Sequence, residues 1–355
     1  MTTVVLGLGR ETRAWLAAHA PADVVVLDEA GGGTAEVAGR DVAVARVDLD
    51  DPAAVRSAVG PDPVTRIVRS PGVAPHRAGV AALDAPTATP TGLWLADAAP
   101  DDLVLITGTK GKSTVAALTA HLLRAAGRRA TLAGNIGTAL TTVDASAPRD
   151  DLVVEVSSYQ LVDLDLPRPA AAAAITTLLV DHVPWHGDVA AYHAAKLRLL
   201  DLATWTVVGP QVAALGATAG RHDVVAADPT DAVRTALAAA GLHAAHEAEA
   251  AMLALALVAR RLGADPAAVV DDLAPALRTF APLPHRLRPI AAVGGVTWVD
   301  DSIATIPEAA LGALATWRPH GPVTLLLGGE DRGQDLTGLV AAAADPEVRV
   351  ALLGA

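Results

Sequence analysis

The segment that most constrains the fold is LVLITGTKGKSTVAALTAHLLRAAG, residues 103–127. An apolar run of strand length meets a turn rich in glycine and lysine, and a helical pattern follows at once. Gly108 and Gly111 allow successive backbone N–H groups to point inward, where they can hold phosphate oxygens. This order of strand, glycine-rich turn and helix predicts an α/β domain with a phosphate-binding loop at the start of the helix.

The side chains of this turn suit a nucleotide. Lys112 offers a point charge to the β- and γ-phosphates, and Ser113 or Thr114 offers a hydroxyl to Mg²⁺. Gly108 lies closer to Lys112 than the first glycine of the general phosphate-loop template does. A glycine-rich turn without a ligand is the alternative interpretation. The predicted nucleotide-binding turn comprises Gly108, Thr109, Lys110, Gly111, Lys112, Ser113 and Thr114.

Composition sets outer limits on function. A chain of 355 residues favours two or three domains, and 52% hydrophobic against 19% charged residues favours well-packed cores. The formal charge of −12 without a basic block argues against a nucleic-acid partner. The absence of cysteine excludes disulfides and thiolate metal sites. No signal-peptide pattern and no apolar run of membrane length are present, so we expect a cytoplasmic protein without membrane insertion.

The first residues predict a Rossmann-like unit. TVVLGLG, RETRAWLAAHA and DVVVLD alternate as strand, helix and strand, which implies a parallel sheet. Gly7 and Gly9 permit a tight turn that directs a helix N-terminus toward an anion, although such a turn also occurs without a ligand. TRIVRSPGV places Ser70 at a strand end, where α/β proteins collect ligands.

Two breaks divide the sequence into three predicted units, 1–98, 99–283 and 284–355. Residues 81–100 are rich in Pro, Thr and Asp and look like a boundary, and residues 281–285 contain two prolines. The third unit stops directly after RVALLGA, which has the pattern of a strand. Because a sheet seldom ends on a bare apolar strand, we expect this C-terminal unit to be truncated.

Two further segments carry candidate ligands. Glu155 lies inside the apolar run LVVEVSSYQL, and a buried acid must either bind Mg²⁺ or pair with a neighbouring Lys or Arg. In TTLLVDHVPWHGDVAAYHAAKLRLL an apolar strand is expected to end at Asp181 and His182. His182 can complete a Mg²⁺ shell or a proton path, or be purely structural. Lys196, on the helix that follows, would by default be a solvated surface lysine.

The segment GVTWVDDSIATIPEAAL places Asp300, Asp301 and Ser302 where a strand ends and a helix soon begins. They are either a turn with a helix cap or residues that face a ligand at the end of the strand. Upstream, in PLPHRLRPI, Arg286 could hold a phosphate or a ribose.

In order, TGTKGKST, GNIG, EVSSYQL, DHVPWHG with AAKLRLL, LPHR and VDDS resemble the Mur ligase family, and most closely its MurD type. The resemblance covers nearly the whole chain. It implies an α/β fold of three domains: a Rossmann-like N-terminal domain for a UDP-linked substrate, a central P-loop ATPase, and a Rossmann-like C-terminal domain for an amino acid. It also implies an ATP- and Mg²⁺-dependent ligase of peptidoglycan synthesis, which joins glutamate to UDP-N-acetylmuramoyl-L-alanine through an acyl phosphate.

The resemblance also implies residue roles. Lys112, Ser113 and Thr114 would hold the ATP phosphates and one Mg²⁺, while Glu155 and His182 would bind a second Mg²⁺. Lys196 matches a lysine that becomes carbamylated and helps to position metal. Asn135 of GNIG would lie near the γ-phosphate, and Arg286 and Asp301 would fold over the nucleotide. The implied catalytic residues are Lys112, Lys196, His182 and Asp301, and the implied substrate contacts are Gly7, Gly9, Ser70, Ser157, Ser158, Thr305 and Arg332.

Departures from the family pattern bear on the amino acid. Where enzymes specific for D-glutamate read DSKATN, this chain has Ile303 in place of the lysine. Arg332 lies in the segment that replaces the lysine after LLLGG, and Lys110 stands where most members have Asn. These features resemble the branch that adds L-glutamate and whose product a separate epimerase inverts. Arg332 is then the cation expected to meet a substrate carboxylate.

Other interpretations stay open. D-glutamate is the alternative amino acid. Glu247 stands where the family has an amide near the adenine, so a nucleotide-binding homologue without ligase activity is a second alternative. Folylpolyglutamate synthetase shares the ATPase core but lacks an N-terminal unit containing SPG. We expect a monomer.

Overall fold

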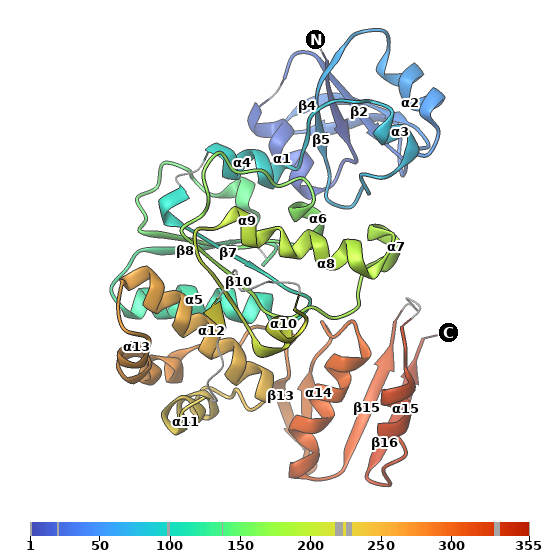
Figure 1. Cartoon of the computed structure of the whole chain (residues 1–355). Coiled ribbons are helices and arrows are strands. Elements are labelled where there is room, and N and C mark those ends of the chain that lie inside the picture. The colour runs from blue at the N-terminus through green and yellow to red at the C-terminus, as the bar shows by residue number, and fades with distance from the viewer. Residues whose placement is uncertain are drawn as a thin grey trace.

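The computed structural model describes residues 2–19, 21–97, 100–136, 138–216, 223–224, 229–329 and 334–354. Its helices and strands form three groups along the chain, which Figure 1 shows at the top, at the left and at the lower right. The α/β class predicted from the sequence is confirmed. No helix in the described part of the chain is long and apolar enough to cross a membrane.

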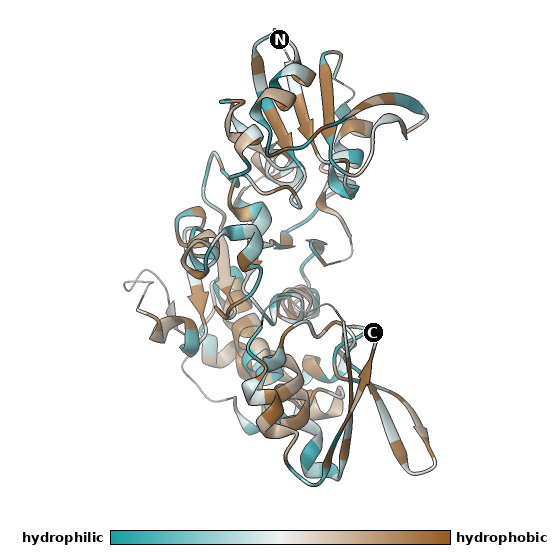
Figure 2. Ribbon diagram, turned by 90° about the vertical axis from the view of Figure 1, so that its right-hand side faces the viewer, coloured by the Kyte–Doolittle hydropathy of each residue, from teal (hydrophilic) through white to brown (hydrophobic). Residues whose placement is uncertain are grey.

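The first group is built on a six-stranded sheet of order β3-β4-β2-β1-β5-β6, parallel except for the pairing of β3 with β4. Successive residues of TVVL face opposite sides of this sheet, so that Val4 and Leu6 enter one apolar cluster and Val5 the other. Figure 2 shows these strands as predominantly hydrophobic. The elements are β1 (Thr2–Leu6), α1 (Arg10–His19), β2 (Val24–Asp28), β3 (Gly33–Val37), β4 (Arg40–Arg46), α2 (Pro52–Val59), β5 (Val64–Arg69), α3 (Ala78–Ala81), β6 (Thr87–Ala88) and α4 (Pro90–Asp97).

The second group has an all-parallel sheet of order β12-β11-β10-β7-β9-β8. The strand that precedes the glycine-rich turn, β7, lies inside this sheet, and the helix that follows it, α5, is buried on nearly all sides. The elements are η1 (Pro100–Asp102), β7 (Leu103–Thr107), α5 (Lys112–Ala125), β8 (Ala130–Gly134), η2 (Leu140–Thr142), β9 (Asp151–Glu155), α6 (Ser158–Leu161), β10 (Ala172–Ile175), α7 (Val183–His186), α8 (Val189–Leu197), α9 (Leu199–Leu202), β11 (Thr206–Val208), α10 (Pro210–Ala214), β12 (Asp223–Val224), α11 (Asp231–Ala239), α12 (Ala245–Leu262), α13 (Pro266–Leu273) and η3 (Ala274–Thr279).

The third group contains an antiparallel pair, β13–β14, and a parallel pair, β15–β16. The helix expected to begin soon after Ser302 is present as α14, and RVALLGA contains most of the strand β16. Each group lies within one of the predicted units 1–98, 99–283 and 284–355, whose limits stay predictions. The elements are β13 (Arg288–Val293), β14 (Val296–Asp300), α14 (Pro307–Trp317), η4 (Arg318–His320), β15 (Val323–Gly328), α15 (Thr337–Ala342) and β16 (Val348–Leu353).

The stretch 81–100 is more ordered than its composition suggests. It contains β6, which pairs with β5, and the helix α4. The first sheet therefore extends to Ala88, and the chain passes to the second sheet between α4 and β7.

A glycine at the end of β8 permits the close approach of β9. Gly134 has φ +104°, and a Cβ there would lie 2.2 Å from the carbonyl oxygen of Glu155. We expect Gly134→Ala to lower the free energy of unfolding by about 3 kcal/mol or more. Gly127 is the matched control, because it also has positive φ (+82°) but nothing within 4 Å of its Cβ position. Gly127→Ala should cost only about 1 kcal/mol. Equal losses in denaturant titrations of the two variants would contradict this account.

Candidate active site

The glycine-rich turn between β7 and α5 has the backbone of an anion-binding loop. Gly108 and Gly111 have φ of +147° and +81°, and Gly111 is the residue that caps α5. A Cβ on Gly108 would lie 1.9 Å from Oγ1 of Thr176, so only glycine fits. The turn thus directs the N-terminus of a buried helix, with its free N–H groups and partial positive charge, toward one point.

Two threonines after β10 brace this turn. The amide of Lys110 donates to Oγ1 of Thr177 (2.9 Å), that of Thr109 donates to the carbonyl of Thr177 (2.7 Å), and Thr176 Oγ1 donates to the carbonyl of Lys110. The prediction that this strand reaches Asp181 was wrong, because β10 ends at Ile175. The residues after it leave the sheet to bond to the turn instead. Sequence reasoning missed both threonines.

Four predicted cations surround the turn. Nζ of Lys112 donates to the carbonyl of Thr109 (3.1 Å), and Nζ of Lys196 donates to that of Gly108 (2.8 Å). Two further hydrogen bonds join the turn to residues of the predicted unit 284–355. Arg286 donates to Oγ of Ser113 (2.9 Å), and Lys110 donates to Oγ1 of Thr305 (2.8 Å).

Lys196 is not the surface lysine that its position on a helix suggests. Its side chain is 1% exposed, with Nζ 4.7 Å from the centre of the Tyr192 ring. Burial lowers the pKa of Lys196 well below its ordinary value, and the nearby charge of Lys112 acts in the same direction. A signal for this site is present in the sequence: Lys110, Lys112 and Lys196 are the only three lysines among the 355 residues.

Glu155 ends β9 beside this cluster and is 1% exposed. Oε1 accepts a hydrogen bond from Nδ2 of Asn135 (3.0 Å), whereas the buried Oε2 has no hydrogen-bond partner within the described ranges. The carboxylate opposes the lowering of the pKa of Lys112 and Lys196, so it lies within electrostatic reach of both. It forms no ion pair with Lys or Arg in the part of the chain that the structure describes.

His182 caps α7 with φ +53°. Its Nδ1 lies 2.8 Å from the hydroxyl of Tyr159, and its amide donates to Asp181, a 6% exposed carboxylate. Of the predicted Mg²⁺ ligands, Ser113 lies in the turn and Lys196 bonds to the carbonyl of Gly108. Glu155 lies within electrostatic reach of Lys112 and Lys196, and so does Asp181, to which His182 is bonded. Among residues with a described placement, no three His, Asp or Glu side chains form a group that could hold a metal ion.

The two serines after β9 are engaged in internal contacts. Ser157 caps α6, and both its amide and its hydroxyl bond to Oε1 of Gln160 (2.8 and 2.9 Å). Oγ of Ser158 lies 3.0 Å from Nε2 of His186. Burial, helped by Lys196, lowers the pKa of His186 to about 4, so this imidazole is neutral at physiological pH.

The predicted N-terminal ligand residues lie together. A Cβ on Gly7 would lie 3.0 Å from Cβ of Ser70, and one on Gly9 would lie 2.8 Å from Oγ of Ser70. The amide of Leu8 between the glycines donates to Asp28 at the end of β2 (2.6 Å). We call Gly7, Gly9 and Ser70 the N-terminal notch.

In the Asp300-Asp301-Ser302 segment, Asp300 forms a local turn and Asp301 bonds to the segment that carries Arg286. Asp300 accepts from the amide of Ser302 (3.0 Å) and closes a turn. Asp301 accepts from the amide of Leu287 (3.1 Å), which holds the segment carrying Arg286. Burial raises the pKa of Asp301. Arg332 lies outside the described residues.

Glu247 caps the start of α12. Its Oε2 accepts a hydrogen bond from the amide of Ala244 (2.7 Å), which satisfies a free N–H at the start of α12. The side chain is 7% exposed, and burial raises its pKa. The departure from the family pattern at this position therefore has a local structural explanation.

Comparisons with known proteins agree with this geometry. Residues 106–208 match the model of the Mur ligase middle domain. A protein of Xanthomonas axonopodis pv. citri named UDP-N-acetylmuramoyl-L-alanine–L-glutamate ligase is 39% identical over 76% of this chain and 62% of its own length. One of the same name from Salinispora tropica is 36% identical over 98% of this chain and 80% of its own length. The chain thus spans less than two thirds of the first relative.

Solved structures agree on the fold. MurF from Acinetobacter baumannii matches 99% of this chain with 80% of its own, at a TM-score of 0.58 and 15% identity. MurC from Thermotoga maritima matches 99% of this chain with 91% of its own, at a TM-score of 0.52 and 14% identity. With the relative from Salinispora aligned over nearly all of this chain, the conclusion is that the chain belongs to the Mur ligase family.

Proposed function

We propose that this chain is an ATP-dependent ligase that joins glutamate, as the L isomer, to UDP-N-acetylmuramoyl-L-alanine. The names of the relatives state the ligation of L-glutamate to this acceptor. The structural observation that best supports the proposal is the arrangement of all three lysines around one anion-binding turn. A turn with free helix N–H groups and several cations suits a triphosphate.

We assign ATP to the turn 108–114. Lys112 and the amides at the start of α5 would hold the β- and γ-phosphates, with Asn135 near the γ-phosphate. Arg286 and Asp301 would reach the nucleotide from the third group. In the structure Arg286 bonds to Ser113, so this hydroxyl must exchange its partner when a nucleotide binds.

The residues fit Mg²⁺ as a cofactor. Glu155 Oε2 is a buried carboxylate oxygen without a partner, and an orphaned anionic oxygen of this kind suits a hard cation. Ser113 would ligate one Mg²⁺, and Glu155 and His182 would ligate a second that a carbamylated Lys196 helps to position. Phosphate oxygens and water would complete shells that protein alone seldom fills. When bound, Mg²⁺ would neutralise phosphate charge.

The proposed reaction has two steps, in which first ADP and then phosphate is displaced. A carboxylate oxygen of the muramoyl-alanine attacks the γ-phosphorus, and ADP leaves. The glutamate nitrogen then attacks the carbonyl carbon of the acyl phosphate, phosphate leaves with that oxygen, and the amine proton goes to solvent. Lys112 and Arg286 would offset the crowded negative charge. The Lys110–Thr305 contact would help to keep water from the acyl phosphate.

We also propose which parts of the chain bind the two other substrates. Residues 1–98 would bind the UDP-linked acceptor at the N-terminal notch, and Ser157 and Ser158 would approach its alanyl end. Residues 284–355 would bind glutamate, with Thr305 and Arg332 among its contacts. We further propose a cytoplasmic monomer whose product is inverted by a separate epimerase.

The pH dependence should report Lys110. Burial lowers the pKa of Lys110 to about 8, although Asp181 opposes the shift. Its charge is therefore present below pH 8 and lost above it. We expect kcat/KM for ATP to fall as pH rises past about 8, by up to tenfold per unit. Lys110→Arg keeps its charge and should flatten this fall. An identical fall in both proteins would show that another group titrates.

The proposed reaction is tested by incubating the protein with ATP, Mg²⁺, UDP-N-acetylmuramoyl-L-alanine and either L- or D-glutamate, and measuring phosphate release. We expect release with the L isomer and little with the D isomer. Release with D-glutamate only would reverse the assignment of the isomer. Release with neither would leave a nucleotide-binding homologue and refute the proposed ligase.

A further inference from the structure

Arg69, the last residue of β5, has a fully buried guanidinium. Nε and Nη2 lie 2.6 Å from Oδ2 of Asp163, and Nη2 also donates to the carbonyl of Tyr159 (2.9 Å). Nη1 donates to the carbonyls of Ser70 (3.3 Å) and Val73. A charge this deeply buried is tolerated only when paired and hydrogen-bonded, and these contacts supply both conditions.

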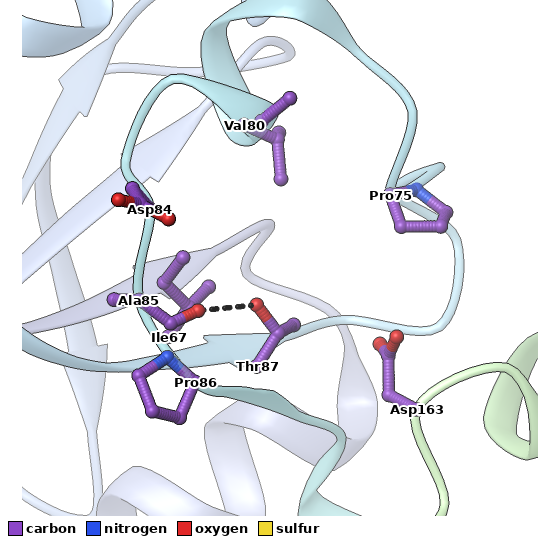
Figure 3. A pocket seen from close by; sticks show the side chains of 9 residues that line it. Ile67, Pro75, Val80, Asp84, Ala85, Pro86, Thr87 and Asp163 are labelled. Carbon is purple, nitrogen blue, oxygen red and sulfur yellow. Dashed lines mark hydrogen bonds between the residues drawn. The ribbon is translucent and has the colours of Figure 1, made fainter.

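The partners of Arg69 come from two different groups. Ser70 and Val73 belong to the turn after β5 in the first group, whereas Tyr159 and Asp163 belong to α6 and the loop after it in the second group. Figure 3 shows Asp163 entering from a separate green segment beside blue segments of the first group, at the edge of a cavity of about 370 Å³. Arg69 therefore bridges the two groups.

An aromatic cluster continues the bridge toward the nucleotide side. The guanidinium of Arg69 lies 5.3 Å from the centre of the Trp185 ring, and Nε1 of Trp185 donates to the carbonyl of Gly72 (3.0 Å). Trp185 stacks on Tyr159 with ring centres 4.3 Å apart. The hydroxyl of Tyr159 in turn bonds to His182.

A second polar contact fixes α6 against the first group. Oε1 of Glu11 accepts from Nε2 of Gln160, and Oε2 accepts from Oγ1 of Thr91, both at 2.8 Å. Glu11 lies in the first turn of α1, directly after the glycines of the N-terminal notch. The short helix α6 is thus bonded both to Glu11, which follows Gly9 of the notch, and to Arg69, which precedes Ser70 of the notch.

From these contacts we infer that Arg69 is a positioning residue, which fixes the N-terminal notch relative to Tyr159 and His182 and so aligns the bound acceptor with the γ-phosphate. The inference rests on the proposed function. Ser70 lies in the notch itself, so the backbone that Arg69 holds is also the backbone that would meet the acceptor. A displacement of about 1 Å between reacting groups can cost a hundredfold in rate.

The test uses Arg69→Lys, which keeps the charge but loses the fork of donors that reaches both groups. Trp185→Phe is a milder variant that keeps the aromatic stack and removes the bond to Gly72. Arg66→Lys is the matched control, because Arg66 is exposed on the same strand. Each protein is assayed for KM of the UDP-linked acceptor, KM of ATP and kcat, and hydrogen exchange is followed at the amides within residues 70–73, which are those of Ser70, Gly72 and Val73.

We expect Arg69→Lys to lower kcat/KM for the acceptor about 10- to 100-fold, with KM for ATP within about twofold. Trp185→Phe should shift the same parameters less, and Arg66→Lys should shift none. Exchange at residues 70–73 should be faster in the first two variants. The inference is overturned if folded Arg69→Lys has wild-type acceptor kinetics, or if ATP and acceptor parameters decline together.

Different results would refute the proposed ligase activity and the positioning role of Arg69. A wild type inactive with both glutamate isomers would refute the ligase alone, and unchanged exchange at residues 70–73 in Arg69→Lys would then refute the positioning role. If Arg69→Lys does not fold, Trp185→Phe decides by the same kinetic criteria.

Discussion

Lys112→Ala is expected to lower glutamate-dependent phosphate release about a hundred- to a thousandfold, the largest effect of any single substitution proposed for this chain. Lys112 follows the glycine that caps α5, and its Nζ bonds to the carbonyl of Thr109 at the turn. In the proposed reaction, a charge held there in advance would stabilise the negative charge that gathers when the carboxylate attacks the γ-phosphorus, without reorganisation at that moment.

The control for this prediction is Arg129→Ala. Arg129 is an exposed cation on the second group that pairs with Asp150. It follows the C-terminal end of α5, whereas the turn lies at the N-terminal end of that helix, so its loss removes one positive charge away from the turn. Surface pairs of this kind contribute little to stability, and activity should stay near wild type. Wild-type release in Lys112→Ala would refute the assignment of the phosphate loop.

Lys196→Ala is expected to lower phosphate release about a hundredfold, with partial recovery when formate or acetate is added. Carbamylation needs the neutral amine, because the nitrogen lone pair attacks CO₂. Burial favours that form, because it lowers the pKa of Lys196. The carbamate would place an anion near Glu155. Lys196→Arg stays cationic and cannot form the carbamate, so it should lose phosphate release to a similar extent, about a hundredfold.

The scarcity of lysine allows a test of this modification that does not depend on activity. With three lysines in the chain, the ¹³C NMR spectrum of protein in ¹³C-bicarbonate should show one carbamate signal from a lysine side chain, apart from any carbamate of the N-terminal amine. That signal should vanish in Lys196→Ala and persist in Lys110→Arg. A signal that survives in Lys196→Ala, or activity of Lys196→Arg equal to wild type, would contradict a carbamylated Lys196.

Local sequence was sufficient where neighbouring residues decide the structure. The apolar run 103–107, the two glycines and the helical pattern after them predicted β7, the turn and α5, because each depends on residues close in sequence. The prediction was wrong for β10, where Thr176 and Thr177 bond to a turn some 66 residues earlier in the chain. No local pattern records such a partner.

The bridge between the first two groups could not be predicted for the same reason. Arg69 and Asp163 are 94 residues apart, and Gln160 and Glu11 are 149 apart. A charged residue at the end of an apolar strand suggests a solvated position unless its partner is known. The helical pattern around Lys196 likewise did not predict that its side chain is buried. The presence of only three lysines in the sequence could have pointed to a special role for each of them.

The central claim is that ATP activates a carboxylate for attack by glutamate, and the transfer of oxygen tests it most directly. UDP-N-acetylmuramoyl-L-alanine labelled with ¹⁸O in its alanyl carboxylate is converted in unlabelled water with ATP and L-glutamate, and the phosphate and product are analysed by mass spectrometry. The account predicts one ¹⁸O in each released phosphate and one left in each new amide. Phosphate without ¹⁸O, released while the acceptor keeps both labels, would contradict it.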